Sequence, residues 1–457
     1  MRDARGNPVS TLSTTALDAT ERALWRMMSF YGTPQDDLTA ARAEDPQWLL
    51  PPLMQCGFLL SLTEPSVLPE ARHVLAACEP LTRAANDRER AHFGALTRLL
   101  AGDWNGACNA WEALLLQHPR DALALQWAHL FDVYRGDSTS LRQRVARVLP
   151  EWDAADALRP YVLGLYAFGL EENQLYAQAE ATGREALAGS ARVPWAMHAV
   201  AHVMEMQGRF TEGSAWLAHW QPDWTDSNGF QGHLGWHHAL FALEALDAGT
   251  ALRRFDMHLA ANREQITLQR LDAAALLWRM HLLGMPTGMR WQALAEGWPR
   301  PAHEAGLYPF NDMHALLALI GSGDLAGARA WAAVVTQQAE LAGGHARDVA
   351  QQVAREVTRE VARDVGLPLM RGLLAFAEER FDDAVQTLYP LCAHAQRIGG
   401  SHAQRDLIDQ TVLAAAARAT DKSAGRALLN ERRLAKPATP LTEHWAARMS
   451  AAAHPIT

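Results

Sequence analysis

Two stretches of the chain each carry a pair of histidines spaced four residues apart. His198 and His202 form the first pair, and His233 and His237 form the second. On an α-helix this spacing places both imidazoles on one face, with their Cβ atoms about 6 Å apart. The sequence therefore predicts two helices that each present an imidazole pair.

Acidic residues continue the same two faces. Glu205 follows His198 by nearly two helical turns, and Glu244 follows His237 by the same interval. Neutral imidazole is the commonest ligand of divalent transition metals such as Zn or Fe, and a mixed His/carboxylate shell with an open position can polarise water. The candidate metal ligands are therefore His198, His202, His233 and His237.

Other polar residues could complete such a site. The catalytic candidates, as general acid or base or by fixing an imidazole tautomer, are Glu205, Glu172, Tyr176 and Asp312. The candidate ligand-binding residues are the four histidines with Trp236, Glu244 and His314.

Two alternatives limit this interpretation. Each histidine could instead donate a hydrogen bond to a Glu or a backbone carbonyl of the next helix, as part of a polar core. Ala199 and Leu234 also stand where an HExxH motif has its glutamate, which disfavours a zincin-type peptidase.

Composition indicates a soluble globular protein. The chain of 457 residues is 49% hydrophobic and 20% charged, and its net charge of −9 comes without any run of Lys or Arg. We therefore expect neither a nucleic-acid partner nor a membrane partner. The N-terminus lacks a secretory pattern and no apolar run reaches about 20 residues, so a cytoplasmic location is expected. The four cysteines lack CxxC spacing and should be reduced.

One local pattern recurs along the chain: a turn, a large apolar residue, and a small residue three places later. In a tetratricopeptide unit the small residues lie where its two helices cross closely. The pattern predicts an all-α fold of tetratricopeptide-like repeats forming a right-handed superhelix, in which first helices line a concave surface. The apolar and small pairs are Trp104 and Ala107, Tyr176 and Ala179, Phe210 and Gly213, Leu325 and Ala328, and Phe381 and Ala384.

We expect one domain over residues 1–457. It comprises N-terminal helices (1–90), repeat-like units with a His/Glu-lined cleft (91–260) and further helical hairpins (261–457), including a charged helix at 346–365. Valines recur every four residues from Val349 to Val365 in that helix. It is either a solvated helix with one packed edge or a dimerisation helix, so a homodimer is possible.

Several longer strings resemble the tetratricopeptide repeat protein 38 family. They are Tyr166–Glu172, Trp195–Arg209, His233–Leu240, Phe310–Ala315 and Gly399–Asp406. The resemblance implies an all-helical, soluble, repeat-like protein, and it brings no established reaction with it.

Two functions remain open. The first is binding of a peptide or a small polar ligand in the concave His/Glu-lined pocket. The second is a metal- or His/Glu-dependent enzyme that acts on a small polar substrate there. Arg209 is the one basic residue between 194 and 244, which weakens the case for a groove that clamps peptide carboxylates.

Overall fold

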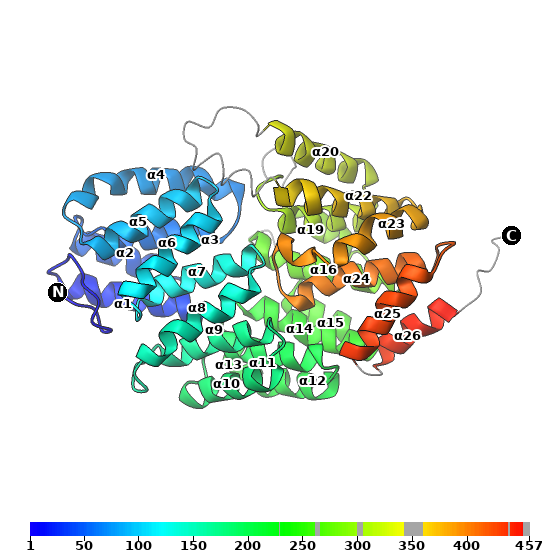
Figure 1. Ribbon diagram of the computed structural model, residues 1–457, viewed down its shortest axis with the longest axis horizontal. Coiled ribbons are helices and arrows are strands. Elements are labelled where there is room, and N and C mark those ends of the chain that lie inside the picture. The colour runs from blue at the N-terminus through cyan, green and yellow to red at the C-terminus, as the bar shows by residue number, and fades with distance from the viewer. Residues whose placement is uncertain (228, 261–265, 299–304, 342–359, 437–438, 451–457) are drawn as a thin grey trace. The chain divides into compact units, whose positions relative to one another are not determined.

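The computed structural model describes residues 1–227, 229–260, 266–298, 305–341, 360–436 and 439–450, and within these ranges the chain is helical (Figure 1). No strand occurs in them. Two isolated bridges, Arg2 with Pro8 and Tyr31 with Ser227, are the β-type pairings recorded there. The all-α prediction is confirmed for this part of the chain.

The contacts of the chain group it into two compact units, which we describe separately. The first unit comprises Met1–Val200 and Pro222–Gln231, and the second comprises the described parts of Ala201–Gln221, Gly232–Gly343 and Arg359–Thr457. The boundary passes through one continuous helix, α11 (Pro194–Met206). The single-domain expectation stays a prediction.

The first unit contains the helices of the N-terminal part of the chain. They are α1 (Thr14–Ser29), α2 (Gln35–Glu44), α3 (Leu50–Ser61), α4 (Leu68–Cys78), α5 (Asp87–Leu100), α6 (Trp104–Gln117), α7 (Ala122–Tyr134), α8 (Ser138–Val148), α9 (Arg159–Glu171), α10 (Tyr176–Gly189), the first part of α11, and α13 (Gln221–Trp224). Consecutive helices pack against one another, as in α5 with α6 and α9 with α10.

The second unit contains the remaining helices. They are α12 (Phe210–His219), α14 (Gln231–Glu244), α15 (Ala248–His258), α16 (Thr267–Leu282), α17 (Arg290–Glu296), α19 (Pro309–Ser322), α20 (Leu325–Leu341), α22 (Leu367–Ala377), α23 (Phe381–Cys392), α24 (His402–Ala416), α25 (Ser423–Ala435) and α26 (Pro440–Ser450). Here too neighbours in sequence pack together, and α16 also contacts α19 and α24.

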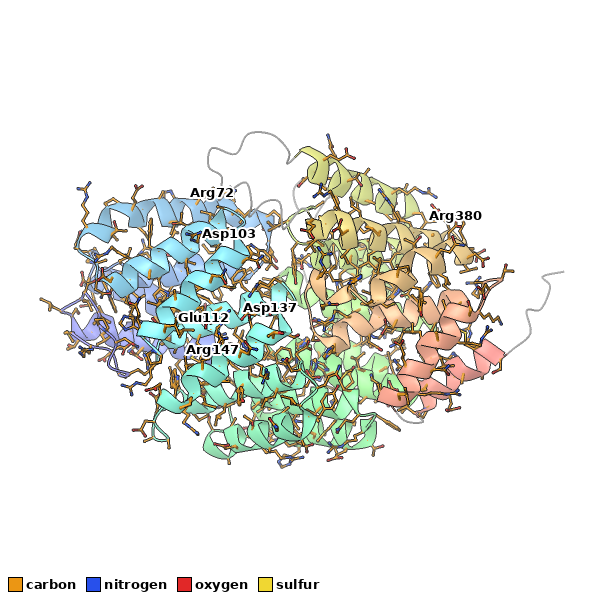
Figure 2. The ribbon with its side chains drawn as sticks, viewed as in Figure 1. Arg72, Asp103, Glu112, Asp137, Arg147 and Arg380 are labelled. Atoms are coloured by element: carbon orange, nitrogen blue, oxygen red, sulfur yellow. The ribbon has the colours of Figure 1, made fainter. Side chains whose placement is uncertain are left out.

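One turn geometry precedes seven of these helices: α6, α8, α10, α12, α15, α20 and α23. In each, a residue with φ between 59° and 88° ends the preceding helix, and the next residue donates its N–H to a carbonyl five residues back at 2.8–3.0 Å. This is the bond pattern of a Schellman motif. Asp103 and Asp137 then accept a hydrogen bond from the first turn of α6 and of α8 as N-caps (Figure 2).

The recurring sequence pattern therefore locates helix starts. The large apolar residue of each predicted turn is the first residue of a helix, and the small residue three places later is buried. Gly213 shows why the position must be small, because a Cβ built there would lie 2.2 Å from the Phe241 ring. Small residues thus allow close helix crossing at these sites.

Three other expectations can be compared with the structure. Cys56, Cys78, Cys108 and Cys392 are all unpaired with one another, and the first three are buried. No helix in the described ranges combines the length and apolarity that crossing a membrane requires. Most of the predicted charged helix at 346–365, including Val349, lies outside the described residues, so the dimer stays a prediction.

Candidate metal centre

Two buried helices carry the histidine pairs. Pro194 starts α11, a position where its missing N–H costs nothing, and α11 is apolar around most of its circumference. From Leu234 to Glu244, α14 is buried as well. A helix that is apolar on all sides is stable only inside a protein, so both histidine pairs are drawn into the interior.

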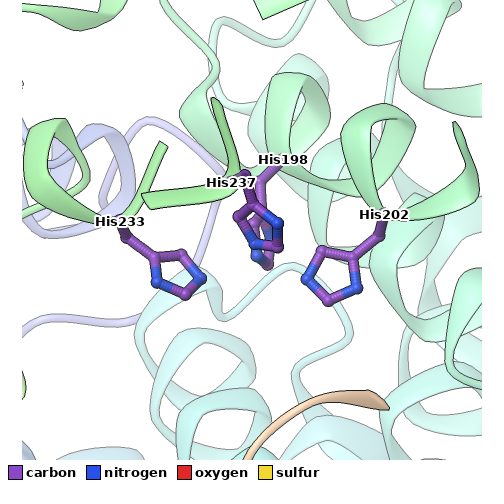
Figure 3. Close-up of side chains that lie close together, drawn as sticks. All are labelled: His198, His202, His233 and His237. Carbon is purple, nitrogen blue, oxygen red and sulfur yellow. The ribbon is translucent and has the colours of Figure 1, made fainter. Parts of the chain in front are cut away.

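The rings of His202, His233 and His237 converge within the second unit. The ring centroids of His202 and His237 are 4.5 Å apart, and those of His233 and His237 are 4.8 Å apart. His202 and His237 are fully buried, whereas the His233 side chain is 19% exposed. Figure 3 shows these rings facing a common space.

His198 lies one turn before His202 on the same helix, so α11 itself fixes the relative placement of the two residues. His198 belongs to the first unit, whereas His202, His233 and His237 belong to the second. The His198 ring also packs on Phe168, Trp195 and Phe230, with centroids 5.0–5.5 Å away.

Buried carboxylates orient two of the rings. Nδ1 of His237 is 3.0 Å from Oε2 of Glu205, and Nδ1 of His233 is 2.8 Å from Oδ2 of Asp272. Where the carboxylate is ionised and the imidazole neutral, the carboxylate accepts the Nδ1–H of each ring and Nε2 keeps its lone pair. This carboxylate–histidine arrangement is the one that commonly supports metal-binding imidazoles.

The surroundings of Glu205 shift its pKa in both directions. Burial raises the pKa of Glu205, while the positive charge of Lys436 and the imidazole of His202 lower it. An ion bound to the imidazoles would favour the ionised form further, since a nearby cation stabilises a carboxylate.

Trp236 packs against the histidines rather than facing a ligand directly. Its ring is stacked on His233 at 5.3 Å with an interplanar angle of 16°, and it meets His237 edge-on at 4.7 Å. The Arg279 guanidinium lies 5.4 Å from the Trp236 ring centroid on another side. Trp236 therefore holds the rings in place by packing.

Glu244 belongs to a second cluster of polar side chains, which lies in the second unit. Thr439 donates a hydrogen bond to Glu244, and the Arg432 guanidinium lies 3.4 Å from its carboxylate. Arg432 also bonds Asp406 at 2.7 Å. Burial alone would raise the pKa of Asp406, but Arg432, Lys436 and Arg279 hold it well below its usual range.

These groups surround a small pocket in the second unit. Its lining residues are Glu205, Phe210, Leu240, Phe241, Leu243, Glu244, Arg279, Asp406, Gln410 and Leu441, and it has room for about one water molecule. Arg279 lines it and Arg432 and Lys436 lie nearby, all three from later helices or loops. The argument from the scarcity of basic residues between 194 and 244 is therefore wrong, because the fold brings basic groups from elsewhere.

The remaining candidate residues have other surroundings. Asp312 accepts hydrogen bonds from the Gly306 N–H at 3.0 Å and from Trp331 Nε1 at 3.2 Å, and burial raises its pKa to about 7. His314 donates through Nδ1 to the Phe310 carbonyl at 2.8 Å. Neither residue is in the group of converging histidines.

Two other candidates belong to the first unit. Glu172 caps the end of α9 and is buried, and Tyr176 begins α10. Burial, together with Glu171 and Glu172, raises the pKa of Tyr176 to about 12. A phenol with that pKa stays protonated near neutrality and can act as a hydrogen-bond donor.

The sequence reasoning missed Asp272, Arg279, Asp406, Arg432 and Lys436. One pattern could have found the first two. Asp272 and Arg279 are charged residues seven apart in the otherwise apolar run of α16, so they share a face that must be buried. Asp406 closes one of the strings that resemble the tetratricopeptide repeat protein 38 family.

Comparison with known families adds no assignment. None of the protein-family models searched matches this chain.

Proposed function

We propose that this protein binds a divalent transition-metal ion through His202, His233 and His237, the three histidines that converge within the second unit. The observation that carries the proposal is the pair of buried carboxylates: Glu205 and Asp272 each hold the Nδ1–H of one imidazole and so leave Nε2 to bind. Histidine rings that only fill the core would not need two carboxylates that leave their Nε2 lone pairs free in the same space.

The donor set favours Zn²⁺, with Fe, Ni and Cu as chemically related alternatives. Neutral imidazole nitrogens suit all of these ions, and Zn²⁺ accepts three or four of them in a tetrahedral site about 2.0–2.1 Å from each nitrogen. Three histidines and a water would give a catalytic site, and His233 is the converging ring with solvent-exposed surface.

The reaction class that follows is metal-assisted attack of water on a small polar substrate. A bound divalent ion lowers the pKa of its water and supplies the nucleophile. Glu205 and Asp272 orient the imidazoles, and the aromatic ring of Trp236 packs beside them. The pocket in the second unit has room for about one water molecule, so neither a peptide nor a small substrate fits it as it stands, and both functions require it to open.

The finer description of the fold belongs to the same proposal. A tetratricopeptide-like superhelix fits the seven similar turns and the buried small residues. Membership of the tetratricopeptide repeat protein 38 family and a cytoplasmic location are proposed with it from the sequence. None of these three points is needed for the metal site.

Metal analysis of the purified full-length chain tests the function. After exposure to Zn²⁺ and dialysis, we expect about one ion per chain, and Co²⁺ should give the visible absorption of a tetrahedral site. His202→Ala and His237→Ala should lose the ion and keep their helical circular dichroism. His238→Ala is the matched control, because His238 is a buried neighbour on α14 outside the converging group.

Two results would overturn the proposal. One is a wild-type chain that retains no ion after dialysis. The other is retention of the ion by both His202→Ala and His237→Ala at the wild-type level. Large destabilisation of those variants without any metal in the wild type would show that the histidines form a polar core.

A further inference from the structure

Gln410 has a buried side-chain oxygen that needs a hydrogen-bond donor. Gln410 lies on α24, is 2% exposed and lines the pocket of the second unit. Its Nε2 donates to Oδ2 of Asp406 at 2.5 Å, whereas its Oε1 accepts no hydrogen bond from the described residues. A buried acceptor without a donor destabilises the folded state, so we expect a donor beside Oε1.

Asp406 determines which way the Gln410 amide points. Burial alone would raise the pKa of Asp406, but Arg432 and the other basic groups nearby hold it well below its usual range, so this carboxylate is ionised and only accepts hydrogen bonds. The NH₂ group of Gln410 must therefore face Asp406, because the reverse orientation would place two acceptors against each other. The donor to Oε1 has to come from another direction.

Two further residues of the pocket have unused hydrogen-bonding positions. Glu205 accepts the bond from His237 through Oε2 at 3.0 Å, and its Oε1 accepts none from the described residues. Arg279 donates through its terminal nitrogens to the carbonyls of Ala275 and Ala403 at 3.1 and 2.5 Å, and its Nε has no acceptor in the same part of the chain. Since both residues line the pocket, it is bordered by acceptors and by a donor.

The charges around the pocket favour an uncharged occupant. Its carboxylates and the neighbouring cations balance one another, so a bound ion would add a charge that nothing compensates. The carboxylates are Glu205, Glu244 and Asp406, and the cations are Arg279, Arg432 and Lys436. The pocket also has room for about one water molecule, and water can both donate and accept.

We infer that this pocket binds one ordered water molecule, which donates to Gln410 Oε1 and Glu205 Oε1 and accepts from Arg279 Nε. About three hydrogen bonds is the usual number for a buried water. Gln410 is then a positioning residue, because through this water it holds Glu205 in place against Nδ1 of His237. The effect of Gln410 on a metal ion rests on the proposed function, whereas binding of the water does not.

Magnetic relaxation dispersion of the solvent, measured on the full-length chain, counts long-lived internal water molecules and tests the water site. Gln410→Met keeps the length of the side chain and removes its polar atoms, so this variant should hold about one such water fewer than the wild type. Gln126→Met is the matched control and should leave the count unchanged. Gln126 is also 2% exposed with an unpartnered Oε1, but it lies in the first unit, outside the pocket.

Chelator competition for Zn²⁺ tests the positioning role. Gln410→Met should weaken the affinity about two- to ten-fold, less than the loss of an orienting carboxylate, and Gln126→Met should not change it. The visible absorption of bound Co²⁺ should shift in Gln410→Met alone, since it reports the ligand field at His237, which a merely structural role of Gln410 would leave unchanged. If the wild type binds no metal, the solvent measurement still decides the water site, so the two failures are distinguishable.

An equal number of long-lived waters in the wild type and in Gln410→Met overturns the water site. Unchanged Zn²⁺ affinity and an unchanged Co²⁺ spectrum in a Gln410→Met variant that has lost the water overturn the positioning role. If Gln410→Met does not fold, Leu441→Phe, which fills the pocket from α26, replaces it in both measurements.

Discussion

The contacts of Glu205 and Asp272 lead to a quantitative prediction for metal affinity. Glu205→Gln and Asp272→Asn keep the shape of each side chain and remove the negative charge that holds an imidazole Nδ1–H. Loss of such a supporting carboxylate typically weakens metal binding about 10–100-fold, or about 1.4–2.7 kcal/mol.

The structure ranks the two variants. His237 is fully buried, so water can take over less of the role of Glu205. The His233 side chain is 19% exposed, and water can take over part of the role of Asp272. We therefore expect a loss near 100-fold for Glu205→Gln and near 10-fold for Asp272→Asn.

Competition with a chromophoric Zn²⁺ chelator of known affinity measures both values. Asp312→Asn is the matched control, since Asp312 is another buried acid of the second unit whose partners are Gly306 and Trp331. Equal affinities in the wild type, Glu205→Gln and Asp272→Asn would refute the orienting role, and the reverse order of the two losses would refute the argument from burial.

Three further predictions concern stability. Gly213→Ala should cost about 1–3 kcal/mol in urea unfolding, because its Cβ would clash with the Phe241 ring, and Phe241→Leu in the same chain should recover part of the loss. The pKa of Asp312 is about 7 in the folded state against 3.8 unfolded, so the folded state holds the extra proton and stability falls as pH rises from about 4 to about 7. Asp312→Asn should abolish up to about 4 kcal/mol of that fall, and an unchanged stability–pH curve would contradict it. Arg88→Met leaves Asp121 buried without its 2.6 Å partner and should cost about 3–5 kcal/mol, whereas a loss below about 1 kcal/mol would show that the pair contributes little.

Local features of the fold were predictable from sequence. The turn before α6 needs only a residue that tolerates positive φ, an Asp103 cap, and Trp104 and Ala107 three residues apart. All of these lie within six residues, so the sequence pattern contains them completely. The four-residue spacing of His198 and His202 on α11 is local for the same reason.

Pairings between distant segments were not predictable. Glu244 meets Arg432 across 188 residues, and His233 meets Asp272 across 39. A buried acid in an apolar helix shows that a partner exists, but which helix supplies the partner depends on packing that no short pattern encodes. For this reason Asp312 was expected near the histidines, whereas the fold gives it Gly306 and Trp331 instead.

The unequal exposure of the three converging rings has a kinetic consequence. Of the three rings, His233 alone has accessible surface, so we expect an ion to enter or leave on its side. Exchange with free ions in solution should then be slow even where the equilibrium affinity is moderate. The ion present when the second unit completes its folding would remain with the protein for long periods, so the supply of metal during synthesis would decide which ion it carries.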